Sequence, residues 1–230
     1  MFAKKKSFQR MGGGFWEQFG VNMLARMQMW MLGTHKDPEV MKLLKKVRKE
    51  RKSLVTAREA FIVHSLATAQ APRPGDFAEV GVYQGSTARI TCEVKGDKLL
   101  RLFDTFEGLP EDSKQDPGVH RTGQYACSLE SVSEYLKDFP NVTFHKGIFP
   151  DSAKDVPDSQ YAFVHFDVDL YDGTLACLEY FYPRMIHGGI MLSHDYSLLD
   201  GVKTAFTEFL EDKEENVIEL PSTQCMLVKL

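Results

Sequence analysis

Residues 216–229 read Asn-Val-Ile-Glu-Leu-Pro-Ser-Thr-Gln-Cys-Met-Leu-Val-Lys, and the spacing within them restricts the topology of the whole chain. They contain two strand-like apolar runs, residues 216–220 and 224–229, which are separated only by Pro221-Ser222-Thr223. A parallel connection between strands needs roughly a dozen residues or more, so a connection of this length is too short. The two runs therefore predict an antiparallel hairpin.

Upstream of this hairpin, short apolar runs alternate with segments of helical spacing. Strands are expected at residues 77–82, 99–103, 142–145, 161–166 and 189–193, and helices at 86–94, 129–138, 174–182 and 202–210. Such alternation is typical of a parallel sheet covered on both faces. We therefore expect an α/β, Rossmann-like fold with a mostly parallel seven-stranded sheet and an antiparallel C-terminal hairpin. This is the layout of class I methyltransferases, whereas the sheet of the dinucleotide-binding fold is all parallel.

The first part of the chain differs from the rest in composition. Residues 1–52 carry 13 basic and 4 acidic side chains, a net charge of +9, whereas the remainder carries 15 and 28, a net charge of −13. Helices are expected at 21–32, at 38–52 with Asp37 as the cap, and from Thr56, which begins a near-capping box, to just before Pro72. We expect a basic, Met-rich helical extension or lid at residues 1–55 and a methyltransferase domain at residues 56–230.

The apolar residues of the first expected helix recur at helical spacing: Met23, Leu24, Met27, Trp30 and Met31. Asn22, Arg26 and Gln28 lie on its other side. Three interpretations stay open for this stripe. It can line a lid over the site, it can form a dimer contact, or it can pack inside the fold, which is the more common outcome for a Met stripe. The loop at residues 111–122 is also placed to cover an acceptor.

The overall composition is that of an ordinary soluble globular protein, with 230 residues, 43% hydrophobic residues, 26% charged residues and a net charge of −4. The four cysteines are too far apart for a zinc motif, and a chain of this length needs no disulfide framework. No apolar run reaches the roughly 18 residues needed to span a bilayer. Glu17 and Arg26 interrupt any signal-like segment, so we expect a cytoplasmic location.

The first expected strand leads into Glu79-Val80-Gly81-Val82-Tyr83-Gln84-Gly85-Ser86, and ligands of open α/β sheets bind beyond such strand ends. Glycines let a ligand approach the backbone, and Ser86 opens a helix with free N–H groups. Glu79 would repel a pyrophosphate but can hold an ammonium or a hydroxyl, which favours S-adenosylmethionine over NAD. Asp104 ends the second strand 23 residues beyond Gly81, close to the offset of a ribose-binding acid. A plain turn and a loop-capping Asp104 are the alternatives.

Acidic and histidine side chains gather after the fourth and fifth expected strands. Strand alternation puts His165, Asp167 and Asp169 on one face, and His194-Asp195 ends the next strand. If the two strands are neighbours, carboxylates this close need a proton or a cation between them. Oxygen ligands in a partly open site suit Mg²⁺. The alternative is that these acids only cap the following helices, as Asp169, Asp172 and Asp195 could.

With these motifs the sequence resembles the macrocin O-methyltransferase family of metal-assisted, S-adenosylmethionine-dependent sugar methyltransferases. The resemblance extends from about residue 56 to the C-terminus and is most specific at residues 103–110, Phe-Asp-Thr-Phe-Glu-Gly-Leu-Pro. The other matching segments are residues 79–85, Asp167-Val168-Asp169-Leu170-Tyr171, Tyr182-Pro183-Arg184, Gly188-Gly189 and Asp195-Tyr196.

The resemblance implies that Glu79, Gly81 and Asp104 hold S-adenosylmethionine, with Gly147 and Ile148 near its adenine. The predicted cofactor-binding residues are Glu79, Gly81, Tyr83, Gly85, Ser86, Asp104, Gly147 and Ile148. The resemblance also implies that Mg²⁺ is bound by Asp167 and by the His194-Asp195 pair after the fifth strand. The predicted metal ligands are therefore Asp167, His194 and Asp195. Family members usually have Asp-Asp-Tyr where this chain has His194-Asp195-Tyr196, and histidine prefers transition metals. The metal is therefore Mg²⁺, another divalent ion, or absent.

We expect an O-methyltransferase that acts on a hydroxyl of a small molecule, a sugar of a natural product or a glycan. Asp167, with Asp195 and a divalent ion, would activate the hydroxyl; in the alternative, His194 is the base and no metal is used. The predicted catalytic residues are Asp167 and His194. We expect a homodimer, with neither nucleic acid nor membrane as partner. Two other functions are weaker alternatives: a non-catalytic protein that binds nucleic acid or an anionic membrane through the basic segment, and an NAD-dependent oxidoreductase.

Overall fold

A seven-stranded sheet in the order β3-β2-β1-β4-β5-β7-β6 runs through the centre of the molecule. The computed structural model describes residues 15–111 and 114–230, apart from the Glu17 side chain. The strands are β1 (Asp76–Val80), β2 (Leu100–Asp104), β3 (Val142–Lys146), β4 (Tyr161–Phe166), β5 (Met185–Ser193), β6 (Ile218–Glu219) and β7 (Cys225–Val228). The first five are parallel, and β7 is antiparallel to both β5 and β6. The predicted fold class and its C-terminal hairpin are confirmed.

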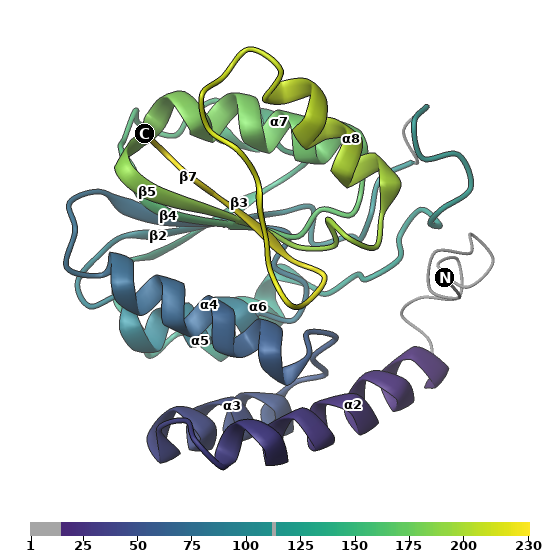
Figure 1. Cartoon of the computed structure of the whole chain (residues 1–230), viewed down its shortest axis with the longest axis vertical. Helices are drawn as coiled ribbons and strands as arrows, with labels where there is room; N and C mark the ends of the chain where they lie inside the picture. The colour runs from purple at the N-terminus through teal and green to yellow at the C-terminus, as the bar shows by residue number, and fades with distance from the viewer. Residues whose placement is uncertain (1–14, 112–113) are drawn as a thin grey trace.

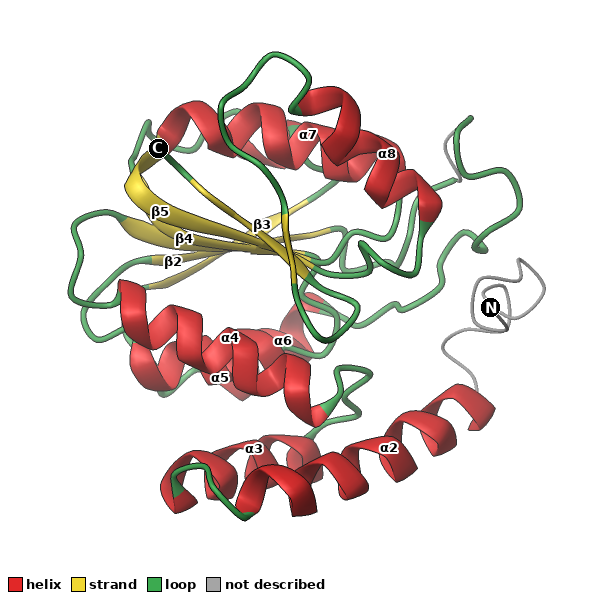
Figure 2. Ribbon diagram, viewed as in Figure 1, coloured by secondary structure: helices red, strands yellow, loops and turns green. Residues whose placement is uncertain are grey.

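Helices cover both faces of the sheet. They are α2 (Phe15–Gly33), α3 (Pro38–Glu50), α4 (Ala57–Gln70), α5 (Ser86–Val94), α6 (Leu129–Leu136), α7 (Tyr171–Phe181) and α8 (Asp200–Phe209). Helices α7 and α8 lie on one face, and α4, α5 and α6 lie on the other (Figure 2). Helices α2 and α3 form a further layer outside α4 and α5 (Figure 1). None of the helices in the described part of the chain combines the length and hydropathy of a membrane span.

Because helices cover the central strand β4 on both faces, ligands can reach the sheet only at the ends of its strands. All six residues of β4 are buried, as expected for a strand with helices on both sides. One apolar cluster joins the sheet to α4 and α5 through residues such as Phe163 and Val63. A second cluster joins it to α7 and α8 through residues such as Phe166 and Phe206. Both faces are therefore closed by side chains, and the loops at the carboxyl ends of the strands are left to form a site.

Helix α2 packs on the rest of the fold with a different side from the one that the spacing of its apolar residues predicts. The buried side consists of Ala25, Gln28, Met29 and Leu32. The residues of the predicted stripe, Met23, Leu24, Met27, Trp30 and Met31, are all exposed. The interpretation of this stripe as a packed face inside the fold is therefore wrong. Gln28 is buried because its amide oxygen accepts a hydrogen bond from the Arg58 N–H at 3.0 Å, at the start of α4.

Helix α2 begins at Phe15, six residues before the expected start at residue 21. Two other element boundaries differ from expectation for identifiable reasons. Helix α7 begins at Tyr171, three residues before the expected start, because the Asp116 carboxylate accepts the Tyr171 N–H at 2.7 Å. Its cap comes from a distant loop rather than from Asp169 or Asp172. Strand β5 begins at Met185 rather than at residue 189, because Met185 already pairs with Tyr161 of β4.

Candidate active site

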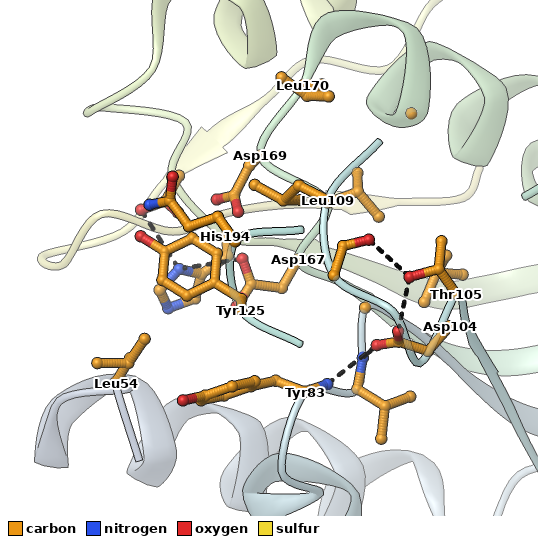
Figure 3. A pocket seen from close by; sticks show the side chains of 18 of the residues that line it. Leu54, Tyr83, Asp104, Thr105, Leu109, Tyr125, Asp167, Asp169, Leu170 and His194 are labelled. Atoms are coloured by element: carbon orange, nitrogen blue, oxygen red, sulfur yellow. Dashed lines mark hydrogen bonds and ion pairs between the residues drawn. The ribbon is translucent and has the colours of Figure 1, made fainter. Parts of the chain in front are cut away.

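A cavity of about 610 Å³ opens at the carboxyl ends of the parallel strands. Its walls come from the loops after β1, β2, β3, β4 and β5, from the start of α4 and from the hairpin turn before β7. Figure 3 shows Asp104 and Tyr83 bordering the same space as Asp167, Asp169 and His194. The structure thus brings the predicted cofactor-binding motif and the predicted acidic cluster together in one cavity.

The loop after β1 is fixed by Asp104. The Asp104 Oδ2 atom accepts the N–H groups of Val82 and Tyr83 at 2.6 and 3.0 Å, and its Oδ1 accepts the Phe106 N–H at 2.7 Å. Gly81 and Gly85 have φ angles of +83° and +76°, a region that favours glycine. The Asp104 carboxylate therefore holds the turn in place while it lines the cavity.

Gly81 also lies in direct contact with the loop after β4. A Cβ atom at this position would lie 1.9 Å from the carbonyl oxygen of Asp167, so no other residue fits without movement of the backbone. The Asp167 N–H donates to the Val80 carbonyl at 2.9 Å, which continues the pairing of β1 and β4 past the strand ends. The loop that carries Asp167 is thus held against the glycine turn.

Six of the eight predicted cofactor-binding residues line the cavity: Gly81, Tyr83, Ser86, Asp104, Gly147 and Ile148. Glu79 and Gly85 do not. Glu79 is 1% exposed, and its carboxylate accepts the Thr87 hydroxyl at 2.6 Å and lies 3.6 Å from Nδ1 of His165. His165 is its register neighbour on β4, and it too is buried behind the cavity wall. Glu79 and His165 therefore form a polar pair inside the sheet.

The predicted metal ligands meet at the ends of β4 and β5. Donor atoms of Asp167, His194 and Asp195 lie within 4.8 Å of one another. His194 Nδ1 is 3.6 Å from Asp167 Oδ1 and 3.4 Å from Asp195 Oδ1. Burial, together with the charges of Asp167 and Asp195, raises the pKa of Asp169 well above its usual value. Asp169 and Asp195 have φ angles of +61° and +56°, conformations that non-glycine residues adopt rarely and that recur at functional sites.

Sequence reasoning did not assign Glu59 to the site. Its Oε2 accepts the Thr56 N–H at 2.8 Å, which completes the capping box of α4, and lies 3.6 Å from His194 Nε2. Its Oε1 accepts the Thr223 hydroxyl at 2.9 Å. The near-capping box was visible in the sequence, but it indicated only a helix start. Glu59, 3% exposed, in fact connects α4, the end of β5 and the hairpin turn.

The charges around His194 determine which side chains of the site carry a proton. Burial alone would lower the pKa of His194, but Asp167, Asp195 and Glu59 raise that pKa well above its usual value. Burial raises the pKa of Asp167 to about 6, although the attraction of His194 opposes this shift. Burial would also raise the pKa of Glu59, but His194 and the hydrogen bonds at Thr56 bring it well below its usual range. The resting site therefore holds one imidazolium among several carboxyl groups.

The long segment after β2 forms an outer wall of the cavity. Its two arms are held together because the Leu109 N–H donates to the Gln124 carbonyl and the Gly123 N–H donates to the Leu109 carbonyl, both at 2.8 Å. This pairing puts Tyr125 beside Tyr83, with ring centroids 6.0 Å apart (Figure 3). In the loop at residues 111–122, which was expected to cover an acceptor, Glu111 and His120 line the cavity. Residues 112–113 lie outside the described chain.

The N-terminal part contributes less to the cavity than the lid interpretation implies. Val21 of α2 and residues 53–56 line it, whereas Met23, Met27 and Trp30 do not. Residues 1–14 of the expected extension lie outside the described chain.

Comparison with known proteins places these observations in context. The profile of the family described as Macrocin-O-methyltransferase (TylF) matches residues 59–224. A tetracenomycin-C rhamnosyl 4'-O-methyltransferase of Streptomyces olivaceus is 31% identical over 141 residues, which are 54% of this chain and 54% of that protein. Demethyldecarbamoylnovobiocin O-methyltransferase of Streptomyces niveus is 26% identical over 152 residues, 59% of this chain and 58% of that protein. The chain spans slightly more than half the length of these curated relatives.

Solved structures confirm the fold. The O-methyltransferase NovP superposes with a TM-score of 0.70 and 22% identity, over 77% of this chain and 81% of NovP. An O-methyltransferase from Bacillus cereus, solved in complex with SAH, superposes with a TM-score of 0.61 and 11% identity, over 91% of this chain and 100% of that one. At these identities the similarity establishes the architecture.

Proposed function

Because the chain belongs to the macrocin-O-methyltransferase family, we propose that it is an S-adenosylmethionine-dependent O-methyltransferase that modifies a sugar hydroxyl of a natural product or glycan. The observation that carries this proposal is the shared cavity: the Asp104-held glycine turn and the Asp167 cluster border one space of about 610 Å³. The names of the relatives support the acceptor class, since the Streptomyces olivaceus protein methylates a rhamnosyl group and one structural neighbour, CalS11, is described as a TDP-rhamnose 3'-O-methyltransferase.

The cofactor half of the cavity suits S-adenosylmethionine. A carboxylate has about four acceptor sites. Three sites of Asp104 are used by backbone N–H groups, so its Oδ1 can still accept a ribose hydroxyl while the carboxylate holds the turn. At Gly81 and at Ser86, where α5 begins, a ligand can come close to the backbone. Ile148 is 58% exposed after β3, and such an apolar surface suits the face of an adenine ring.

The acceptor half suits activation of a hydroxyl. In methyl transfer the methyl carbon–sulfur bond breaks as the carbon–oxygen bond forms, so the sulfonium becomes a neutral thioether and the hydroxyl proton must be taken up. The Asp167 side chain is 28% exposed, and its pKa, raised to about 6, is suited to a proton acceptor near neutral pH. We therefore assign the proton to Asp167. The same carboxylates keep His194 protonated, which disfavours the metal-free alternative with His194 as base.

The donor set also fits a divalent cation. Two carboxylate oxygens and one imidazole nitrogen lie within 4.8 Å, and neither nitrogen of His194 has a hydrogen-bond partner in the described structure. Asp167, His194 and Asp195 would hold the ion, which would displace a proton from His194 on binding. Glu59 would orient the imidazole from its far side, as outer carboxylates do at metal sites. When bound, the ion would lower the pKa of the acceptor hydroxyl. Histidine in this set favours Mn²⁺ or another transition metal over Mg²⁺.

Calorimetric titration tests the proposal at the cofactor. We expect S-adenosylmethionine and its demethylated product to bind and NAD not to bind. Transfer of labelled methyl from S-adenosylmethionine to TDP-rhamnose and to a rhamnosyl glycoside then tests the acceptor class. NAD binding without S-adenosylmethionine binding would reject the proposal, and transfer only to amine or thiol acceptors would reject its oxygen specificity.

A further inference from the structure

Helix α2 exposes a long apolar face to solvent. The exposed fractions along this face are 74% for Phe15, 79% for Trp16, 55% for Phe19, 64% for Met23, 55% for Met27 and 75% for Trp30. Scattered exposed apolar residues are ordinary, but a contiguous face of this kind marks an interaction site. Since the other side of the helix already packs on α4, this face needs a partner outside the described fold.

Cationic side chains lie directly beside this apolar face. A shallow groove between α2 and α3 is lined by Asn22, Ala25, Arg26, Met29, Trp30, Lys45, Arg48 and Lys49. It thus contains four cationic residues and no carboxylate. Arg26, Lys45 and Lys49 make no ion pair with any residue in the described ranges, whereas Lys42 and Lys46 pair with Glu39 and Glu50 of their own helix. The groove therefore presents unneutralised positive charge next to an indole ring.

This combination identifies the partner's chemistry. An exposed aromatic and apolar surface beside Lys and Arg suits the interface of an anionic membrane. Here the apolar side chains come from α2, and three of the four cations of the groove come from α3. Residues 53–230 carry a net charge of −13 and are repelled by such a surface, so only the α2–α3 face would approach it. A peripheral contact of this kind needs no membrane-spanning helix.

Two other partners fit less well. A two-fold contact between copies of this chain would add a second set of the same cations to the interface, with no carboxylate lining the groove to pair with them. A nucleic acid would match the cations, but it would leave the apolar residues from Phe15 to Met27 without a matching surface.

We propose that the exposed face of α2, together with the cationic groove between α2 and α3, docks the protein onto an anionic phospholipid surface, which replaces the expectation from the sequence that no membrane is a partner. The side chains of Trp16 and Trp30 would lie at the level of the lipid headgroups. Arg26, Lys45 and Lys49 would contact the phosphates.

The chain offers a direct reporter, because it has only two tryptophans and both lie on this face. On addition of vesicles of phosphatidylcholine with 30% phosphatidylserine at low salt, we expect a blue shift of the tryptophan emission and co-sedimentation of the full chain. Both effects should weaken with added salt and be much smaller with pure phosphatidylcholine. No shift and no co-sedimentation with the anionic vesicles would overturn the proposal.

Charge variants separate docking from general attraction. Lys45→Gln with Lys49→Gln should weaken vesicle binding about 25-fold, at about fivefold for each charge near the surface. Lys154→Gln with Lys203→Gln removes the same charge from exposed positions elsewhere and should change binding little. Equal effects of the two double variants would contradict the proposal. A second variant, Phe19→Ser with Met23→Ser, removes exposed apolar groups, keeps both tryptophans and should also weaken binding.

The rival partners give different outcomes. Tryptophan emission that is already blue-shifted without lipid, and that depends on protein concentration together with a dimer in sedimentation velocity, would assign the face to a second copy. Tighter binding to single-stranded RNA than to anionic vesicles would assign it to nucleic acid. Either result would overturn the membrane proposal.

Discussion

His194 Nε2 lies 3.6 Å from Glu59 Oε2, although the two residues are 135 positions apart in the chain. The contact joins the first turn of α4 to the end of β5, on the side of the imidazole that faces away from Asp167 and Asp195. A buried carboxylate in this place does two things for the imidazole. It fixes the orientation of the ring, and it favours a proton on Nε2, so that Nδ1 is directed toward the two aspartates.

Replacement of Glu59 tests this role. Glu59→Gln removes one of the charges that raise the pKa of His194, so that pKa should fall in an NMR titration of the labelled histidines. Turnover should decrease about 10- to 100-fold, the range found for outer partners of metal-bound histidines. Thr223→Val is the matched control, because it removes a hydrogen bond to Glu59 and leaves the charge. It should lower stability but leave the titration of His194 in place. An unchanged titration in Glu59→Gln would show that Glu59 only caps α4.

Asp104 should be required for the cofactor. Asp104→Asn removes the charge and one acceptor from a side chain that holds three backbone N–H groups. Affinity for S-adenosylmethionine should fall about 10- to 100-fold, as expected for the loss of a charge-assisted hydrogen bond. Calorimetry measures this change, with Asp151→Asn, an exposed carboxyl on the surface, as the control. Wild-type affinity in Asp104→Asn would remove Asp104 from the binding site.

Gly81→Ala should unfold or severely weaken the protein. Its Cβ would overlap the Asp167 carbonyl and its φ angle of +83° is unfavourable for alanine, so we expect a loss of about 4 kcal/mol or more in the free energy of unfolding. Gly96→Ala is the control, since Gly96 has a φ of +61° but no atom within 4 Å of the added Cβ. That variant should lose only about 1–2 kcal/mol. Equal losses by urea denaturation would mean that the Gly81 contact is unimportant.

Metal removal separates the two modes of acceptor activation. Treatment with EDTA should abolish methyl transfer and leave S-adenosylmethionine binding intact, because the proposed ligands Asp167, His194 and Asp195 are distinct from Asp104 and the glycine turn. Mn²⁺ should restore activity better than Mg²⁺, and His194→Asp should reverse this preference. Full activity in the chelator would instead favour activation by the side chains alone.

The stability of the C-terminal segment should depend on Glu215. Burial would raise the pKa of Glu215, but Lys229, 2.7 Å away, and the Tyr182 hydroxyl, 2.8 Å away, lower that pKa to about 2. A carboxyl with a lowered pKa contributes stability above its unfolded value of 4.5, and this contribution is lost as the pH falls toward 2. In urea denaturation, the free energy of unfolding of Glu215→Gln should therefore be lower than that of the wild type at pH 7. This difference should shrink between pH 4.5 and 2. Glu211→Gln, which removes an exposed neighbouring carboxylate, is the matched control.

The sequence predicts the parts of this protein that depend on local pattern. The change from helical to strand periodicity near residue 76, and the short connection Pro221-Ser222-Thr223, are enough for the sheet and its hairpin. Asp104 and Asp167 are predictable for the same reason, since each follows a strand and parallel strands bring their carboxyl ends to one edge.

Other features depend on contacts between distant segments. No local pattern connects Glu59 with His194, so the sequence indicates only a helix cap. The orientation of α2 is also not encoded by its spacing, because the side that carries Gln28 also contains apolar residues, and it is this side, with Ala25, Met29 and Leu32, that is buried. The sequence identifies Glu79 as part of the motif at the end of β1. The direction of its side chain follows from the pleat of β1, which turns the carboxylate toward Thr87 and His165.

The backbone contact between Gly81 and Asp167 limits where this protein can diversify. The glycine turn and the loop that carries Asp167 meet there with no room for a side chain. If the cavity binds as proposed, the spacing between its cofactor half and its acceptor half cannot be adjusted by substitution at Gly81. The outer walls, formed by Val21 and by the segment around Leu109 and Tyr125, belong to no strand of the sheet. Under the proposed function, adaptation to new acceptors is expected to accumulate in those walls while the contact between Gly81 and Asp167 is kept unchanged.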